Sequence, residues 1–224
     1  MLDDLKTFLP AAGLASRMQG IPKFLLPLYK EKTLLGFHLD NLLELKNNEV
    51  VIGTSSQFYN NLTNIHSEQN ILEIESKSMV ETVVKLDLDQ NRTSLVVMPD
   101  TYFSDYEIVN QMRKKLSSTD LDVVLGLWKI KNDQKGKLGQ CRIEGELIKK
   151  IIDKDPNCTE DFFWGLIMWK PKFNDYISID DPHFGVCLNR SIEEKLKIGF
   201  VKSKEQYFDC GTFDEYLKLV KSFN

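Results

Sequence analysis

The chain has 224 residues, of which 42% are hydrophobic and 28% are charged, and its formal net charge is −4. This composition is ordinary for a globular protein with one large domain or two small ones. The negative net charge argues against a general nucleic-acid binder, which needs a basic face to neutralise phosphates. No run approaches 18 apolar residues, so we expect no membrane span.

Cysteine spacing and the first residues bear on the compartment. The four cysteines contain no Cys-x-x-Cys pair, so we expect buried, reduced thiols rather than a disulfide framework or a zinc site; they are Cys141, Cys158, Cys187 and Cys210. The start, Met-Leu-Asp-Asp-Leu-Lys, has no apolar core typical of a secretory signal. A cytoplasmic location is therefore expected.

The first two-thirds of the chain alternates short β-rich runs with segments of helical period, which is typical of βαβ units around a mostly parallel sheet. Strands are expected over residues 7–10, 49–53, 71–74, 94–98 and 122–128. Helices are expected from residue 34, over 79–86 and over about 106–116.

The pattern changes after residue 130, where Gly136, Gly139 and Gly145 separate short strands, among them residues 146–152. A buried strand over 162–169, a helix over 192–196, an extended run over 199–202 and a final helix from residue 213 follow. We predict one α/β domain over residues 1–224, with a nucleotide-type half over about 1–130 and a more antiparallel half over about 131–224.

The loop after the first strand carries the first candidate site. Its sequence, PAAGLASRMQGIPK from Pro10 to Lys23, combines small residues with the cations Arg17 and Lys23. Small side chains let backbone N–H groups approach a ligand, and the cations indicate an anion. A tight turn with two solvated basic residues is the alternative. The loop has neither a Walker sequence nor the Gly-x-Gly-x-x-Gly of dinucleotide folds, but it follows a strand, where α/β sheets bind ligands.

Two aspartates follow later strands. Asp100 comes directly after the strand 94–98 and is placed to hold Mg²⁺ between phosphates, although a helix N-cap or an Asx-turn would also explain it. Asp209 precedes a Gly-Thr turn that opens the last helix. In that turn Thr212 could simply cap the helix, with Glu215 completing a capping box.

In this order the motifs resemble those of the sugar-1-phosphate nucleotidylyltransferases, over about residues 6–218. The family's glycine-rich loop ending in Arg and its Pro-Lys pair match Ala11, Ala12, Gly13, Leu14, Ala15, Ser16, Arg17, Pro22 and Lys23. Its metal-binding aspartate matches Asp100, its Glu-Lys-Pro element is similar to Asp153-Lys154-Asp155-Pro156, and its strand glycine to Gly165. Its Asp-x-Gly-Thr motif matches Asp209 to Thr212.

The resemblance implies a Rossmann-like three-layer fold with a mixed, mostly parallel sheet, in which the second half binds the sugar phosphate. It implies that a sugar 1-phosphate attacks an NTP and that pyrophosphate leaves. Mg²⁺ would be held by Asp100 and Asp209, and the nucleotide by residues 11–17 and Lys23. Arg17 would hold the β- and γ-phosphates, Lys23 would meet charge at the α-phosphate, and Lys154 and Gly165 would contact the sugar phosphate. The implied partners are these substrates, without nucleic acid or membrane; a homo-oligomer stays open.

The sequence departs from the family at three places. Ala15 stands where a second loop glycine is usual, the spacer before Pro22 is short, and residues 76–82 replace the base-reading stretch of thymidylyl enzymes. The base and the sugar are therefore not determined. Glu81 and Thr82 could touch the nucleotide or lie on a helix face.

Other readings stay open beside this one. A cytidylyltransferase for phosphocholine or another alcohol phosphate would use similar chemistry. A GT-A glycosyltransferase would normally show Asp-x-Asp, whereas Thr101 and Tyr102 follow Asp100. A catalytically silent homologue has no chemical need for the four charged residues Arg17, Lys23, Asp100 and Asp209.

Overall fold

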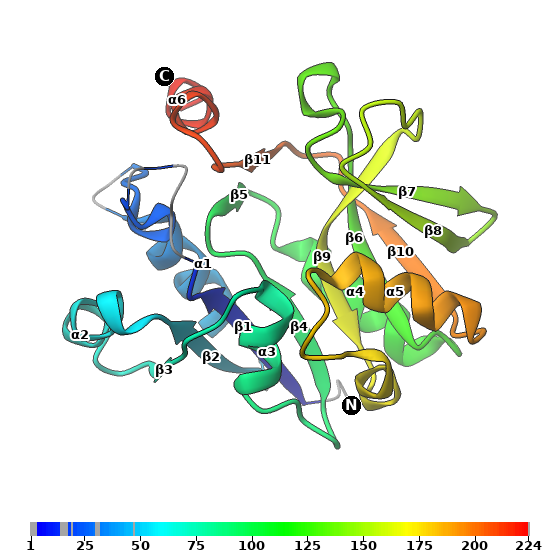
Figure 1. Cartoon of the computed structure of the whole chain (residues 1–224), viewed down its shortest axis with the longest axis horizontal. Coiled ribbons are helices and arrows are strands. Elements are labelled where there is room, and N and C mark those ends of the chain that lie inside the picture. Colours follow the sequence, from blue (N-terminus) through cyan, green and yellow to red (C-terminus); the bar gives the residue numbers. More distant parts are fainter. Residues whose placement is uncertain (1–3, 14–17, 19, 30–31, 47, 224) are drawn as a thin grey trace.

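A mixed β-sheet forms the centre of the computed structural model, which describes residues 4–13, 18, 20–29, 32–46 and 48–223. Within these residues the sheet has nine strands, seven of them in the order β10-β6-β9-β4-β1-β2-β3 (Figure 1). The strands of this path are β1 (Leu5–Ala11), β2 (Asn48–Thr54), β3 (Asn70–Glu73), β4 (Thr93–Val97), β6 (Val123–Lys129), β9 (Phe162–Trp169) and β10 (Ile198–Lys202).

The two halves of the sheet differ in strand direction. β1 pairs in parallel with both β2 and β4, and β2 pairs in parallel with β3. In the second half β9 runs antiparallel to β4 and β6, and the antiparallel hairpin of β7 (Gly139–Glu144) and β8 (Leu147–Asp153) branches from it. This confirms the predicted mostly parallel sheet with a more antiparallel second half.

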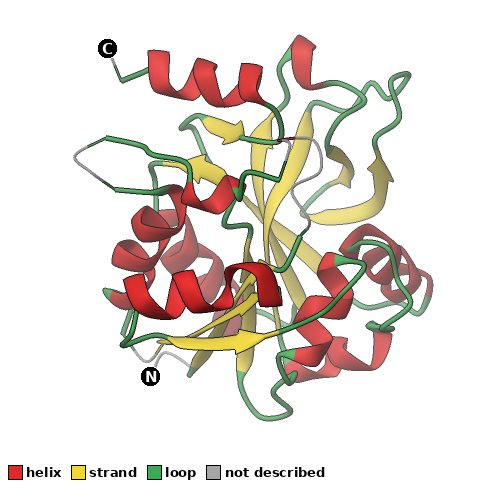
Figure 2. Ribbon diagram, turned by 60° about the vertical axis from the view of Figure 1, so that its left-hand side comes forward, coloured by secondary structure: helices red, strands yellow, loops and turns green. Residues whose placement is uncertain are grey.

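Helices cover both faces of the sheet and give the predicted three layers (Figure 2). On one face lie α1 (Leu34–Leu43), α2 (Ser56–Ile65) and α4 (Glu107–Ser118), whose buried side chains share one core. On the other lie α3 (Met79–Lys85) and α5 (Phe184–Glu193), which share a second core. Alternation along β1 serves both cores, because Leu5 and Leu9 pack on one face and Phe8 on the other.

One expected helix is misplaced, and one helix was not expected. The helix expected over 192–196 lies earlier, at α5, and the chain leaves it at Glu194, with Lys195 in the left-handed region at φ 66°. Gly185 and Asn189 weaken the helical signal there, although Phe184 and Leu188 form the buried stripe. Helix α2 was not expected, because its sequence is mostly polar and only Phe58 and Leu62 of it are buried.

A second, two-stranded sheet lies beyond the end of β4. Strand β5 (Thr101–Phe103) pairs antiparallel with β11 (Tyr207–Asp209), which leads into the last helix, α6 (Phe213–Lys221). Figure 1 shows β5, β11 and α6 together at one end of the molecule.

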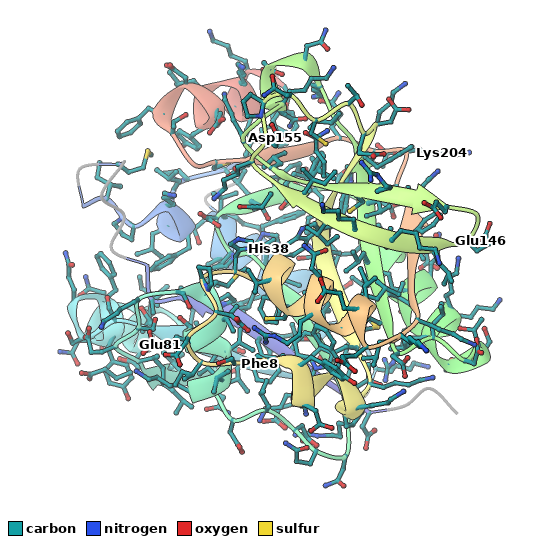
Figure 3. The ribbon with its side chains drawn as sticks, turned by 45° about the vertical axis from the view of Figure 1, so that its right-hand side comes forward. Phe8, His38, Glu81, Glu146, Asp155 and Lys204 are labelled. Atoms are coloured by element: carbon teal, nitrogen blue, oxygen red, sulfur yellow. The ribbon has the colours of Figure 1, made fainter. Side chains whose placement is uncertain are left out.

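His38 connects helix α1 to β5 in the interior (Figure 3). Its Nε2 donates to the carbonyl oxygen of Thr101 at 2.8 Å, so its Nδ1 accepts the hydroxyl hydrogen of Tyr106. Complete burial lowers the pKa of His38 to about 4 despite the Thr101 contact. The imidazole is therefore neutral at pH 7, and its two hydrogen bonds tie α1 to Thr101 of β5 and to Tyr106 at the start of α4.

All four cysteines are free and buried, as predicted. In the part of the chain that the structure describes, no helix has the length and apolar character needed to cross a membrane.

The free energy of unfolding should decrease as the pH is lowered, because of His38. Its pKa is about 4 in the folded state and about 6.5 in an unfolded chain, so the unfolded state binds more protons between these values. The free energy of unfolding should therefore drop by about 2 kcal/mol between pH 7 and pH 5 from this group alone. Urea unfolding of the unchanged protein and of His38→Gln at both pH values measures the difference. Equal pH dependence of the two would contradict it.

Candidate active site

The pairing of β5 with β11 brings Asp100 and Asp209 together. After β4 a turn, in which the N–H of Thr101 donates to the carbonyl of Met98 at 3.3 Å, places Asp100 just before β5. In the β5–β11 register Asp209 stands opposite Thr101, and the N–H of Cys210 donates to the carbonyl of Asp100 at 3.1 Å. Two carboxylates that are far apart in the sequence thus meet at the carboxyl end of β4.

Lys23 reaches the same point from the first loop. It begins a short 3-10 helix, Lys23–Leu25, and its Nζ lies 3.4 Å from Oδ2 of Asp100. The Lys23 side chain is only 13% exposed. Both residues line a small cavity together with Pro10, Ala11, Gly13, Phe24 and Pro99. The start of the loop, Lys23 and Asp100 therefore border one space, as the sequence predicted.

Negative charge is concentrated around the β5–β11 pair. Burial raises the pKa of the Cys210 thiol, and the carboxylates of Asp100, Asp209 and Glu215 raise it further, while Lys23 opposes them. Within the described residues no group of three or more His, Cys, Asp or Glu side chains could hold a metal ion. Two neighbouring carboxylates suit Mg²⁺, which takes one or two protein carboxylates and completes its shell with phosphate oxygens and water.

A second, wider cleft also borders Asp100. Among its lining residues are Asp100, Asp209, Lys137, Asp153, Lys154, Trp164 and His183. Lys154 has φ 50° although it is not glycine, and its N–H donates to the carbonyl of Leu138 at 3.4 Å. A strained backbone of this kind persists only where the surrounding structure enforces it, and it is common at binding sites.

Sequence reasoning missed His183 and Trp164. His183 is the N-cap residue of α5, and its Nε2 lies 3.5 Å from Oδ2 of Asp153. In the described part of the chain, its Nδ1 and the Nε1 of Trp164 are buried without a hydrogen-bond partner. No spacing in the sequence indicates this meeting, because the three residues come from β8, β9 and the turn before α5.

Gly165 lies in β9, and the space beside its Cα is filled by protein side chains. A Cβ there would stand 2.5 Å from Cε2 of Tyr207 and 2.9 Å from Cζ3 of Trp128. The missing side chain therefore lets Tyr207 pack against β9, and Tyr207 begins the strand that carries Asp209. A contact of Gly165 with substrate stays a prediction.

The remaining predicted residues divide into two groups. Ala11 and Ala12 are buried at the end of β1, whereas Leu14, Ala15, Ser16 and Arg17 lie outside the described residues. The helix-cap alternative for Asp100 is wrong, because a strand follows it. Thr212 does cap α6, accepting from the N–H of Glu215.

Glu81 and Thr82 both have structural partners. The Glu81 carboxylate accepts from the N–H of Lys77 at 2.7 Å and pairs with Lys85. The Thr82 hydroxyl bonds to that of Ser76 at 2.6 Å. These contacts fit the helix-face reading of both residues.

The three-layer fold, with charged groups at the carboxyl ends of its parallel strands, defines an α/β protein of the nucleotidyltransferase type. A family model described as the MobA-like NTP transferase domain matches residues 8–134, more than half of the chain. The chain therefore belongs to the MobA-like NTP transferase family. No curated protein sequence gives a significant match.

Solved structures share the fold over nearly the whole chain. A Bacillus anthracis protein assigned as a glucose-1-phosphate thymidylyltransferase, in complex with sucrose, is 14% identical with a TM-score of 0.82, over 97% of this chain and 94% of that one. A UDP-glucose pyrophosphorylase complexed with UDP-glucose is 18% identical with a TM-score of 0.79, over 98% of each chain. The UDP-glucose pyrophosphorylase of Acinetobacter baumannii is 14% identical with a TM-score of 0.76, over 98% of this chain and 93% of that one.

Replacing Gly165 should destabilise the protein. Because a Cβ would overlap the Tyr207 ring, Gly165→Ala should lower the free energy of unfolding by about 1–3 kcal/mol. Gly13→Ala is the matched control, since a Cβ there meets no atom of the described residues within 4 Å. Its unfolding free energy should change by less than about 0.5 kcal/mol. Urea unfolding measures both, and a Gly165→Ala protein as stable as the control would contradict this packing argument.

Proposed function

We propose that the chain is a sugar-1-phosphate nucleotidylyltransferase, which joins an NTP to a sugar 1-phosphate and releases pyrophosphate. One observation carries the proposal: Asp100, beside Asp209, lines both the small cavity with Lys23 and the wider cleft with Lys154. Two anionic substrates, one in each space, would meet at this aspartate. The fold shared with enzymes of this class supports the same assignment.

Charge repulsion is the main obstacle to this reaction. Two unit charges 4 Å apart repel by roughly 4 kcal/mol at an effective dielectric of 20, and phosphates carry more than one. Asp100 and Asp209 fit Mg²⁺, which when bound would neutralise this charge and polarise the α-phosphate. Lys23, which lies 3.4 Å from the Asp100 carboxylate, would add a fixed positive charge at the same point.

The bond changes need no side-chain base. An oxygen of the sugar phosphate, already ionised, forms a bond to the α-phosphorus, and the bond from that phosphorus to the pyrophosphate oxygen breaks. Lys154, which its neighbours hold in a strained backbone conformation, would orient the sugar phosphate for attack. The expected contact of Arg17 with the β- and γ-phosphates stays a prediction.

Polar groups in the cleft support a sugar as the acceptor. Asp153 can accept hydrogen bonds from hydroxyl groups. The buried Nε1 of Trp164 can donate one, and the described structure holds no other partner for it. A sugar ring satisfies such groups, because each hydroxyl both donates and accepts. Choline offers neither donor nor acceptor at its ammonium end.

A substrate screen tests the proposed function. Pyrophosphate release would be followed with UTP, CTP, dTTP and GTP, each combined with a set of sugar 1-phosphates or with phosphocholine, in the presence of Mg²⁺. We expect release with at least one sugar 1-phosphate. Release with CTP and phosphocholine alone would replace the proposal by a cytidylyltransferase, and no release with any pair would refute both.

Asp100→Asn should lower kcat by roughly 10²–10³, the usual cost of removing one electrostatic stabiliser. A chelator should abolish activity of the unchanged protein, and added Mg²⁺ should restore it. Steady-state rates with the best substrate pair measure both effects. Full turnover by the Asn variant would contradict the metal assignment.

Lys23→Ala should lower kcat more than it raises the KM for the NTP. The reason is that the Lys23 ammonium would neutralise negative charge that develops only as the α-phosphate reacts. Lys32→Ala is a suitable control, since Lys32 forms an exposed pair with Asp40 away from the cavity. We expect a loss of about 10²-fold in kcat for the first variant and little change for the second. Equal kinetics of the two variants would show that Lys23 is a surface lysine only.

A further inference from the structure

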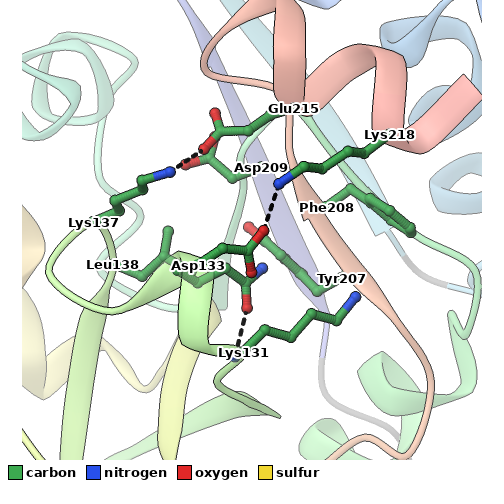
Figure 4. Close-up of a pocket in the computed structure, with 10 residues that line it drawn as sticks. Lys131, Asp133, Lys137, Leu138, Tyr207, Phe208, Asp209, Glu215 and Lys218 are labelled. Atoms are coloured by element: carbon green, nitrogen blue, oxygen red, sulfur yellow. Dashed lines mark hydrogen bonds and ion pairs between the residues drawn. The ribbon is translucent and has the colours of Figure 1, made fainter.

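Two ion pairs join the loop 131–138 to helix α6, as Figure 4 shows. Lys137 pairs with Glu215, with 3.4 Å between Nζ and Oε1, and Lys218 pairs with Asp133. Each pair links the same two segments. The side chains of both lysines and of Asp133 are more than half exposed, whereas that of Glu215 is 20% exposed. The two ion pairs differ in the cavities that their lysines line.

Only Lys137 also borders the cleft beside Asp100. It lines the outer pocket of Figure 4 together with Lys218, but it lines the cleft with Asp100, Asp209 and Lys154 as well. Lys218 lines the outer pocket but is not among the residues that line the cleft. Lys137 is therefore a second lysine at the proposed acceptor site, beside Lys154.

The backbone explains why the two lysines converge. Gly136 has φ 72°, and a Cβ there would stand 2.9 Å from Cα of Pro156. The loop that carries Lys137 is thus pressed directly on the segment that carries Lys154. The hydrogen bond from the N–H of Lys154 to the carbonyl of Leu138 joins the same two segments. Both side chains start from one fixed patch of backbone.

The Glu215 pair is an easily broken restraint. The Lys137 side chain is 54% exposed, so water screens its attraction to Glu215. The other carboxylate oxygen of Glu215 accepts the hydroxyl hydrogen of Thr212 at 3.1 Å, so Glu215 keeps a partner if Lys137 leaves. A phosphate in the cleft carries more charge than a carboxylate and offers three oxygens to the flexible ammonium group.

We propose that Lys137 binds the phosphate of the acceptor, and that it exchanges Glu215 for this phosphate when the acceptor enters. The inference rests on the proposed function, because that function supplies an acceptor phosphate. Glu215 competes with the acceptor for Lys137 and holds the lysine at the cleft while the acceptor is absent. Lys137 is thus a substrate-binding residue and Glu215 a positioning residue.

The test compares Lys137→Ala with Lys218→Ala, because each variant removes a half-exposed lysine and breaks one ion pair between the same two segments. Calorimetric titration with α-D-glucose 1-phosphate and with inorganic phosphate, in the presence of Mg²⁺, gives the Kd of each anion. Lys137→Ala should raise the Kd by about 10-fold or more, the effect of one hydrogen bond to a charged group. Lys218→Ala should leave it unchanged, and Lys137→Arg should restore most of the affinity. Equal Kd values for the two alanine variants would overturn the inference.

Glu215→Gln tests whether Lys137 exchanges Glu215 for the phosphate or whether the Lys137–Glu215 pair only braces the loop. Removing the competing charge should lower the Kd by about two- to threefold, the effect of a weak surface pair. If the pair only braced the loop, both Lys137→Ala and Glu215→Gln would weaken binding, and that result would overturn the exchange. Failure of the unchanged protein to bind either anion would also overturn it.

The outcome can be told apart from that of the proposed function. If the substrate screen gives no pyrophosphate but Lys137→Ala still loses anion affinity, the lysine assignment holds and the reaction is wrong. If turnover is found, Lys137→Ala should raise the KM for the sugar phosphate and leave the KM for the NTP within about twofold. Turnover with both KM values unchanged would overturn the inference while the proposed function stands.

Discussion

The antiparallel pairing of β5 with β11 is the interaction on which the candidate active site depends. Asp100 follows one strand of the large sheet, and Asp209 lies near the end of the chain. The backbone hydrogen bond from Cys210 to Asp100 fixes their relative position. Because backbone bonds set this register, the two aspartates border one cleft before any ligand binds. Such preorganisation lowers the cost of gathering charge at a reaction centre.

Aromatic packing supports this small sheet from below. The rings of Phe103 and Tyr207, one from each strand, lie parallel with centroids 6.2 Å apart. Tyr207 packs closely over Gly165 of β9. The absence of a side chain at Gly165 therefore lets the two-stranded sheet pack against the large sheet. His38 secures the opposite edge through the Thr101 carbonyl. The site is thus built on buried packing rather than on loops alone.

Charges of opposite sign alternate across the site. Lys23 faces Asp100 from the first loop, and Lys137 faces Glu215 beyond Asp209. A phosphate substrate entering between them would find cations already held in place by carboxylates that can release them. The exposed pair is the easier of the two to exchange, because solvent weakens its attraction. Because the Lys23 side chain is mostly buried and that of Lys137 is half exposed, the contact of Lys23 with Asp100 should be the more fixed one, and the contact of Lys137 with Glu215 the more movable one.

Much of the molecule follows from local sequence patterns. The parallel strands and the position of an aspartate directly after β4 were predicted, because strand alternation and turn residues are local signals. The helix α5 was misplaced, since its buried stripe runs through poor helix formers that only tertiary packing stabilises. Local patterns also cannot show which strands pair at long range.

The sequence by itself predicted the class of fold, and it marked Lys23, Asp100, Asp209 and Lys154 as candidate site residues. Only the tertiary structure decided which of them meet, because the β5–β11 register and the Lys23 contact join distant segments. It also placed His183, Trp164 and Lys137 in the lining of the cleft, although no sequence motif indicates them. It showed that Gly165 makes room for Tyr207. Spacing along a chain encodes neighbours on one element, whereas a site assembled from several strands and loops is encoded in how the whole core packs.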